Sequence, residues 1–440
     1  MAVSRCASGR IERSPRERKL AVTDSVDVVV IGGGPGGAAA ATLVAQKGHR
    51  VLLLERAPEP RFKIGESLMP ATWWTLERLG VLEKLKASPF VRKHSVQFFG
   101  KSGKPSAPFY FQEADPHESS VTWQVLRSEF DALLLDNAQE HGVEVRRGAA
   151  VKDVLFEGDR AVGVDCGDAQ IAARVVVDAT GQSALLARKL GLLQRDPGLR
   201  KASVFTHFKG ALRDTGIDEG ATLVIHTADA SAWFWYIPLP DDRVSVGWVG
   251  APEVLAGHPG GDPQAFFDQQ AAACGEIRRR LLDARGARQV LPIQVLRDFS
   301  YRSSQIAGDG WVLVGDAFGF LDPIYSSGVF LALQSGALAA DSINAALATD
   351  DPSAERLGAH GPGFVAGMEA MRKLVYAFYE PEFSFAKFLA RHPGHRGDIT
   401  HLLVGNLSRP SDRLFAAMGE MVRLPDDARL AEPAAIGGPR

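Results

Sequence analysis

Apolar runs and glycine alternate near the start of the chain. An almost uninterrupted β-branched run at residues 26–31 predicts a short buried strand. Glycine-rich residues follow at once, and the alanines at 38–41 predict a helix. A second apolar strand is expected at residues 50–54, ending at Glu55. Strand, glycine loop, helix and strand in this order indicate a doubly wound α/β unit.

The glycine loop has the spacing G-x-G-x-x-G, with Gly32, Gly34 and Gly37 at the motif positions. The first makes a tight turn, the second lets the backbone approach a pyrophosphate, and the third lets helix and strand pack closely. Unpaired N–H groups at the helix start favour phosphates. Glu55 has the spacing of a carboxylate that binds the ribose hydroxyls of an adenosine. Glycine clusters often only mark turns, so it is the ordered context that predicts a dinucleotide site.

Three later segments resemble the landmarks of the p-hydroxybenzoate-hydroxylase-like flavoproteins. The first in chain order is Gln124–Asp131. The second is an apolar run followed by Asp178-Ala179-Thr180-Gly181, and the third is the run Trp311–Val314 followed by Gly315-Asp316. With the glycine loop they span residues 26 to about 345. The resemblance implies that the cofactor is FAD, that Arg127 lies near its diphosphate, and that Asp316 accepts from a ribityl hydroxyl. For Arg127, an ordinary arginine on a helix face is an open alternative.

An aromatic run, Trp233-Phe234-Trp235-Tyr236-Ile237-Pro238, predicts an extended strand with both indoles on one face. Core packing is the alternative for any aromatic strand. The pattern W-x-W-x-I-P resembles the signature of the flavin-dependent halogenases. The resemblance implies that Trp233 and Trp235 shield the flavin, so that the substrate does not touch it and a small diffusing oxidant is made.

The pattern F-x-x-P-x-x-S-x-G at residues 320–328, followed by a helix predicted over residues 329–347, also resembles these halogenases. Ser327 and Gly328 would open the helix, where unpaired N–H groups and the dipole favour a halide ion. An N-cap serine and a turn glycine are the alternative. Tyr325 stands where the tryptophan halogenases have Glu. This departure argues against tryptophan and resembles the branch that acts on phenols and pyrroles, some of them tethered to a carrier protein.

In the halogenases, a lysine that handles hypohalous acid follows a G-E-[ST]-x-x-P motif and a helix. Here the motif is at residues 65–70, a helix is predicted to about residue 85, and Lys93 has the matching position. The resemblance implies that this lysine hydrogen bonds the acid or carries the halogen as a haloamine. A desolvated lysine would have a lowered pKa. Lys63, expected nearer the flavin, is the competing candidate, and a solvent-facing lysine is the commonest case.

Composition narrows the function classes. The chain has 440 residues, a net charge of −2, and scattered rather than clustered Lys and Arg, so neither nucleic acid nor a membrane surface is an expected partner. No apolar run approaches the roughly 20 residues of a bilayer-spanning helix. Three widely spaced cysteines give no metal spacing and fit a reducing cytoplasm. Residues 1–24, Arg-rich and without an apolar stretch, are expected to be a disordered extension.

Together the patterns predict an FAD-binding domain over residues 25–350, interleaved with a mixed-sheet substrate domain (strands at about 90–125 and 200–300), and a helical C-terminal region over 351–440. The predicted activity is FADH2- and O2-dependent halogenation of an electron-rich aromatic, free or carrier-bound, through a flavin hydroperoxide and hypohalous acid formed from chloride or bromide. Without a second dinucleotide motif, we expect a separate flavin reductase. The alternatives are an aromatic hydroxylase using NAD(P)H, a geranylgeranyl-type reductase and a flavoprotein without catalysis.

Overall fold

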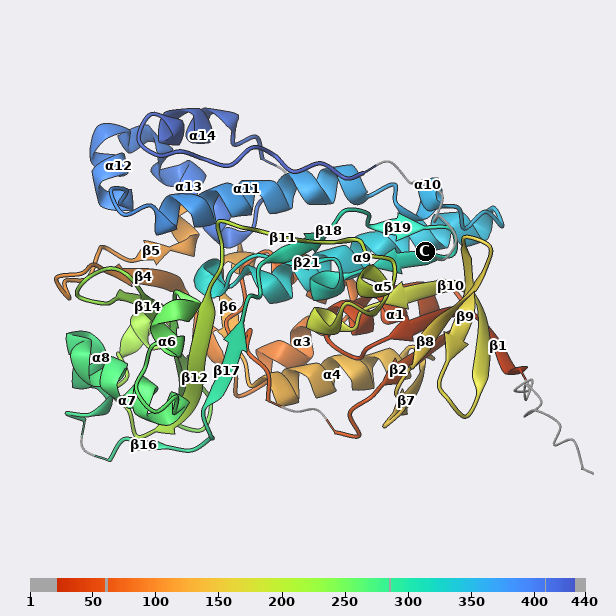
Figure 1. Ribbon diagram of the computed structural model, residues 1–440, viewed down its shortest axis with the longest axis horizontal. Helices are drawn as coiled ribbons and strands as arrows, with labels where there is room; N and C mark the ends of the chain where they lie inside the picture. The colour runs from red at the N-terminus through yellow and green to blue at the C-terminus, as the bar shows by residue number, and fades with distance from the viewer. Residues whose placement is uncertain (1–21, 60–61, 285, 408, 432–440) are drawn as a thin grey trace, which may run out of the picture.

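The first sheet contains the apolar runs predicted near the start of the chain (Figure 1). Among the residues that this computed structural model describes (22–59, 62–284, 286–407 and 409–431), it has eight strands, in the order β19-β20-β10-β1-β2-β7, with the hairpin β8–β9 joined to β10. The strands are β1 (Val22–Ile31), β2 (Val51–Glu55), β7 (Glu144–Arg147), β8 (Asp153–Glu157), β9 (Arg160–Asp165), β10 (Gln170–Asp178), β19 (Ala307–Gly308) and β20 (Trp311–Leu313). The run from β20 to β7 is parallel, so helices must cover both faces.

The first strand begins earlier than expected. β1 starts at Val22 and pairs with β10, so residues 22–24 belong to the sheet and not to the extension predicted over residues 1–24. The rest of that predicted extension, residues 1–21, lies outside the described residues.

Three helices hold the glycine loop against the end of β20. They are α1 (Pro35–Ala45), α4 (Arg127–Glu140) and α9 (Ser327–Ala348). α1 and α9 pack closely because glycines stand at their contact: a Cβ at Gly336 would lie 2.4 Å from the backbone oxygen of Gly36. After β20, Gly315 donates its N–H to the Ser335 hydroxyl of α9 (2.8 Å). The glycine loop at the start of α1 and the Gly315 turn after β20 therefore both contact α9.

The second sheet is mixed and lies beside the first (Figure 1). Its order is β16-β12-β15-β14-β13-β4-β5, with β17 also on β12, and the pair β13–β4 is parallel. Its strands are β4 (Ser95–Phe99), β5 (Phe109–Tyr110), β12 (Ala202–Lys209), β13 (Thr222–His226), β14 (Trp233–Leu239), β15 (Arg243–Gly250), β16 (Arg288–Gln289) and β17 (Gln294–Arg297).

The two faces of the second sheet bury alternate side chains. On one face, Phe234 and Trp248 pack in a core with α6 (Pro252–Ala256), α7 (Pro263–Ala273) and α8 (Gly275–Leu281). On the other face, Trp233 and Trp235 pack in the core that includes the first sheet. The period of two along β14 thus sends both indoles to the same side, as the sequence predicts.

Smaller elements connect the two sheets. β3 (Val91–Lys93) pairs with β6 (Thr122–Gln124), and β11 (Leu193–Arg195), β18 (Tyr301–Ser303) and β21 (Gly319–Phe320) form another small sheet. The remaining short helices are α5 (Leu185–Lys189), η1 (Phe111–Glu113), η2 (Glu118–Ser120), η3 (Gly181–Ser183), η4 (Gly216–Asp218), η5 (Gly315–Ala317), η6 (Pro323–Tyr325) and η7 (Pro393–His395).

The prediction of a single helix that ends near residue 85 is wrong. The chain forms two helices there, α2 (Thr72–Arg78) and α3 (Leu82–Lys86). Gly80 lies between them with a φ of 74°, a left-handed conformation that ends a helix and that glycine adopts without steric cost.

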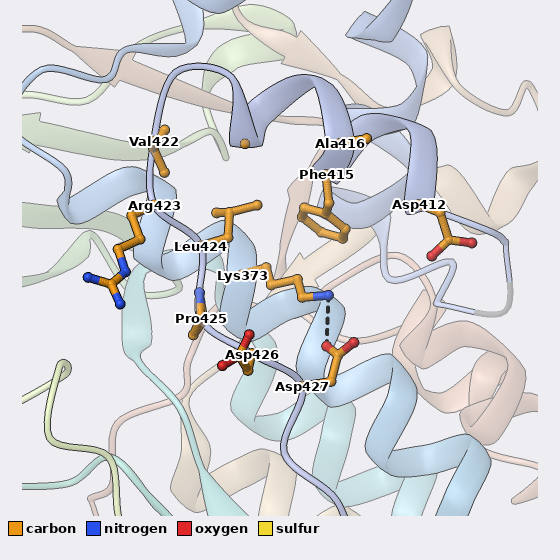
Figure 2. A pocket seen from close by; sticks show the side chains of 11 residues that line it. Lys373, Asp412, Phe415, Ala416, Val422, Arg423, Leu424, Pro425, Asp426 and Asp427 are labelled. Carbon is orange, nitrogen blue, oxygen red and sulfur yellow. Dashed lines mark ion pairs between the residues drawn. The ribbon is translucent and has the colours of Figure 1, made fainter.

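The C-terminal region is helical and runs along the top of Figure 1. It contains α10 (Ala354–Leu357), α11 (Gly361–Tyr379), α12 (Phe385–Arg391), α13 (Arg396–Val404) and α14 (Asp412–Gly419). A cavity of about 530 Å³ lies between α11, α14 and residues 422–427, where Lys373 Nζ pairs with Asp427 Oδ1 at 2.7 Å (Figure 2). Within the described part of the chain, no helix combines the length and apolar character needed to cross a membrane.

Candidate active site

A larger cavity, of about 650 Å³, lies between the two sheets. Most of the residues singled out from the sequence line it: Gly32, Gly34, Gly37, Glu55, Arg127, Trp233, Trp235, Asp316 and Gly328. Lys63 lines it as well, whereas Lys93 and Ser327 do not. We call this space the central cavity.

The three motif glycines meet different surroundings. At Gly32, where φ is 109°, a Cβ would lie 2.3 Å from the Ala179 oxygen, and at Gly37 it would lie 2.0 Å from the Gly32 oxygen. The fold itself therefore requires these two glycines. At Gly34 a Cβ would meet no described atom within 4 Å, although this residue lines the cavity just before α1 begins. Gly34 leaves room for a group that occupies the cavity.

Glu55 ends β2 at the edge of the central cavity. Its Oε2 accepts from the Gly33 N–H at 2.7 Å, and its Oε1 accepts from the Ala57 N–H at 2.8 Å. These bonds hold the carboxylate beside the glycine loop, as expected from the strand–loop–helix order.

Arg127 is the first residue of α4, and its side chain is buried. The guanidinium forms a bidentate pair with Asp131, with Nε–Oδ1 at 2.9 Å and Nη2–Oδ2 at 3.1 Å, and Nη1 donates to the Ile64 carbonyl. The side chain is thus buried and paired within its own helix, and its role toward a diphosphate stays a prediction. The side chain ties α4 to the segment before Gly65 and presents a positive charge at the cavity.

Asp316 lies across the cavity, just after β20. Burial raises the pKa of its carboxyl to about 6, against the opposing effect of the positive charges of Arg127 and Lys63. A partly buried acceptor at the cavity lining is suited to a hydroxyl donor from a bound molecule.

Three aromatic side chains from the second sheet close one side of the central cavity, and we call Phe205, Trp233 and Trp235 the aromatic wall. The ring centroids of the two indoles are 6.3 Å apart, and those of Phe205 and Trp235 are 5.6 Å apart. The indole N–H of Trp235 donates to the Ser245 hydroxyl at 3.1 Å, which fixes the ring.

The wall is tied to the segment that precedes α9. The indole N–H of Trp233 donates to the Tyr379 hydroxyl at 2.9 Å, and this hydroxyl donates to Asp322 Oδ2 at 3.0 Å. Asp322 Oδ1 accepts from the Ile324 N–H at 3.0 Å, and burial raises the pKa of this carboxyl to about 7. Sequence reasoning missed this connection, since Tyr379 belongs to an aromatic stretch that reads as ordinary helix packing.

Helix α9 begins beside the wall. Ser326 precedes it in a left-handed conformation (φ 57°), and its side chain makes no capping bond within the described residues. Ser327 is the first helical residue, and its side chain is buried away from the cavity, whereas Ser326 and Gly328 line it. A Cβ at Gly328 would lie 2.9 Å from Cε2 of Phe320. The unpaired N–H groups of this first turn are thus at the cavity edge.

Lys93 is the last residue of β3. It contacts Leu68, the residue that follows the lining residues Glu66 and Ser67, and does not itself line the cavity. Its side chain is only 3% exposed. The amine donates to the Leu68 carbonyl at 3.0 Å and lies 5.3 Å from the centroid of the Phe111 ring. Burial lowers the pKa of this amine from its ordinary 10.5 to about 7, so both the amine and the ammonium are present near neutral pH.

Comparison with known families decides what this arrangement is. A family model described as tryptophan halogenase matches residues 110–383, more than half of the chain. The chain is a flavin-dependent halogenase. A second family model, described as FAD dependent oxidoreductase, matches residues 27–189 of the halogenase.

Curated relatives and a solved structure agree with this assignment. The halogenase is 35% identical over 333 residues to the 1H-pyrrole-2-carbonyl-(peptidyl-carrier protein) brominase of Pseudoalteromonas luteoviolacea, across 74% of this chain and 79% of the relative. It is 31% identical over 407 residues to the corresponding chlorinase of Pseudomonas fluorescens, across 87% and 89%. The structure of the flavin-dependent brominase Bmp2 matches with a TM-score of 0.80 at 30% identity, covering 90% of this chain and 98% of that one.

These findings confirm the predicted fold class and reaction. The halogenase has the α/β FAD-binding fold, uses FAD and a halide, and halogenates an aromatic compound. The alternative of an aromatic hydroxylase is wrong. The family description names tryptophan, whereas the two curated relatives above are named for a pyrrole on a carrier protein.

The structure also shows a buried pair that the sequence did not reveal. His207 Nε2 and Glu66 Oε1 are 2.6 Å apart, both side chains are about 2% exposed, and Glu66 lines the central cavity. The Phe62 ring packs against His207 with centroids 4.7 Å apart. The partners are 141 residues apart in the chain, so no local pattern links them.

Proposed function

We propose that the halogenase transfers bromine or chlorine to a pyrrole-type ring carried as a thioester on a carrier protein. Two relatives are named for this substrate, at 35% and 31% identity. Tyr325 also supports it: this buried residue occupies the position where the tryptophan halogenases have Glu, and its hydroxyl donates to the Leu374 carbonyl at 3.1 Å. A pyrrole is activated by its own nitrogen and needs no second carboxylate partner. A free phenol is the competing substrate.

In this proposal, the residues around the central cavity hold FAD. The diphosphate would lie against the Gly32–Gly37 loop, in the space left open at Gly34, with Arg127 supplying positive charge. Glu55 takes the ribose hydroxyls and Asp316 a ribityl hydroxyl. When bound and reduced, FAD would give two electrons to O2, and the halide would give the other two and become hypohalous acid, with release of water. A separate flavin reductase delivers reduced FAD by diffusion, and the cytoplasm stays the predicted location.

The halide site is the start of α9. The backbone N–H groups of Ser327 and Gly328 have no intrahelical partners and belong to the positive end of the helix dipole. A halide there would lie at the cavity edge next to Gly328, where the absence of a side chain allows a close approach.

The observation that carries the proposal is the placement of Lys93. A buried amine with a pKa near 7 lies outside the lining of the FAD cavity, on the far side of the segment that follows Glu66. The aromatic wall keeps the substrate away from the flavin, so the oxidant must move to Lys93. As ammonium, Lys93 donates a hydrogen bond to the acid. As amine, it takes the halogen from the acid with release of water, and then passes the halogen to a ring carbon in exchange for the ring proton.

The experiment that tests this function combines the purified enzyme, FAD, a generic flavin reductase, NADH and O2 with a pyrrole-2-carbonyl carrier protein, the free pyrrole acid, simple phenols or tryptophan. Each substrate is tested in chloride and in bromide. Intact-protein mass spectrometry should show the halogen isotope doublet on the carrier-bound ring. The product should be lost in Lys93→Ala and kept in Lys63→Ala. A halide-independent gain of one oxygen, or a halogenated product from Lys93→Ala, would contradict the proposal.

A further inference from the structure

Between the central cavity and Lys93 lies a group of buried polar side chains that the function above leaves unassigned. The Ser67 and Thr222 hydroxyls are 2.8 Å apart, and both residues line the cavity. Gln124 Nε2 donates to Thr222 Oγ1 at 2.9 Å and to the Gly220 carbonyl at 2.8 Å. All three side chains are at most 3% exposed. We call Ser67, Thr222 and Gln124 the polar relay.

The strand register places this relay on the path to Lys93. Ser67 faces Gln124 across one edge of β6, and Lys93 faces Thr122 across the other edge. Thr122 and Gln124 are two residues apart, so these side chains project from the same face of β6. Ser67 and Lys93 are therefore separated by two strand spacings across the sheet and two residues along it, about 12 Å in all.

The relay has two hydrogen-bonding functions left over, one hydroxyl proton and one amide oxygen. The two hydroxyls have two protons and use one between themselves, so one O–H remains for another acceptor. The Gln124 amide cannot be flipped, because its NH2 group faces two oxygen acceptors. Its Oε1 is buried and has no partner among the described residues. Leaving an acceptor buried without a donor costs free energy, which makes this atom a candidate to receive a ligand.

Resting on the proposed role of Lys93, we propose that the polar relay binds hypohalous acid as it leaves the FAD cavity and hands it to Lys93. Hypohalous acid is a small neutral molecule with one O–H donor and one acceptor oxygen, which matches the relay. Its oxygen accepts from the free hydroxyl of Ser67 or Thr222, and its O–H donates to Gln124 Oε1. No covalent bond changes in this transfer. Gln124 and Thr222 are then residues that touch the reacting species between flavin and lysine.

The test separates delivery of the oxidant from its formation. Gln124→Met and Thr222→Val remove the hydrogen-bonding groups while keeping similar size, Thr222→Ser restores the hydroxyl, and Ser203→Ala removes a buried hydroxyl of the same sheet that does not line the cavity. The enzyme with FAD, reductase and bromide acts on the aromatic that the wild type halogenates best. A soluble 1,3-dione traps oxidant that escapes, FAD fluorescence gives cofactor affinity, and thermal unfolding reports on the fold.

We expect Gln124→Met and Thr222→Val to bind FAD and consume reduced flavin as the wild type does. Product per flavin oxidised should fall by about tenfold, the factor that one lost hydrogen bond corresponds to, with the missing oxidant in the trap. Thr222→Ser and Ser203→Ala should keep the wild-type ratio. An unchanged ratio in Gln124→Met and Thr222→Val, or a lower FAD affinity that accounts for the loss, would overturn the relay. Full product from Lys93→Met would instead overturn the proposed function.

Discussion

The Trp235 indole lies across Gly247 on the neighbouring strand. The two residues are paired in the register of β14 and β15, and a Cβ at Gly247 would lie 2.2 Å from Cζ2 of the ring. The same glycine is paired with Phe205 on β12. The absence of a side chain at Gly247 thus leaves the space that the Trp235 ring occupies next to Phe205, with an angle of 42° between the two ring planes.

Gly247→Ala should displace the Trp235 ring. Overpacking of this kind lowers stability by about 1–3 kcal/mol, and the moved ring should change indole fluorescence and raise the fraction of reduced FAD that is oxidised without halogenation. Gly250→Ala is a matched control, because its Cβ would meet the Trp248 ring at 2.4 Å on the opposite face of the sheet, away from the cavity. Equal uncoupling in both variants would disprove a specific role of the wall.

Gly34→Ala should separate cofactor binding from folding. The added Cβ meets no described atom within 4 Å, and the backbone conformation (φ −73°) suits any residue. The variant should therefore be as stable as the wild type or more stable by about 0.4–1 kcal/mol. Its FAD affinity should fall by about tenfold or more, since the methyl group would occupy the space proposed for the diphosphate. Fluorescence titration and thermal unfolding of the FAD-free protein check this, and unchanged affinity would exclude the proposed diphosphate position.

Arg127→Met should destabilise the protein by about 3–5 kcal/mol, because it leaves the Asp131 carboxylate buried without its partner. The double variant Arg127→Met/Asp131→Leu should recover most of that loss in chemical denaturation. It should not recover FAD affinity if the arginine contacts the diphosphate. Recovery of both properties would show that the role of Arg127 is structural.

Lys93→Met should stabilise the protein in a pH-dependent way. The folded-state pKa of Lys93 is about 7, below its ordinary 10.5, so the buried ammonium costs most at pH 7 and below. The cost, of the order of 5 kcal/mol, shrinks as pH rises from 7 toward 10.5, where the unfolded state also loses the proton. Thermal unfolding at pH 6.5 and 9.5 should show a larger gain at the lower pH. Lys101→Met, at an exposed position, controls for the loss of one positive charge.

The start of α9 offers a direct check of the halide site. In Gly328→Ala the new Cβ would lie 2.9 Å from Cε2 of the Phe320 ring, at a position that lines the cavity. The KM for bromide should rise by about tenfold, while FAD affinity stays unchanged, because the change is confined to the first turn of the helix. Steady-state rates across a bromide series measure this. A fall in kcat with the same bromide KM would argue against halide binding there.

The sequence by itself determined those features that depend on local backbone geometry. The glycine spacing at Gly32 and Gly37 could be read because the steric demand arises within one turn and its neighbouring strand. The shared direction of Trp233 and Trp235 follows from the period of a strand, and the helix start at Ser327 follows from its motif. Each of these statements needs only a few consecutive residues.

The tertiary structure alone decided which distant side chains meet. Ser67 and Thr222 are 155 residues apart in the chain, and Trp233 and Tyr379 are 146 apart. Neither pair is visible in a pattern, because such contacts are set by how two sheets and a C-terminal helix pack and not by local conformation.

The break between α2 and α3 was also missed, since one glycine either ends a helix or is tolerated within it according to its surroundings. The burial that lowers the pKa of Lys93 has the same origin: a lysine is exposed by default, and only the packing of β3 against the Leu68 segment removes its amine from water.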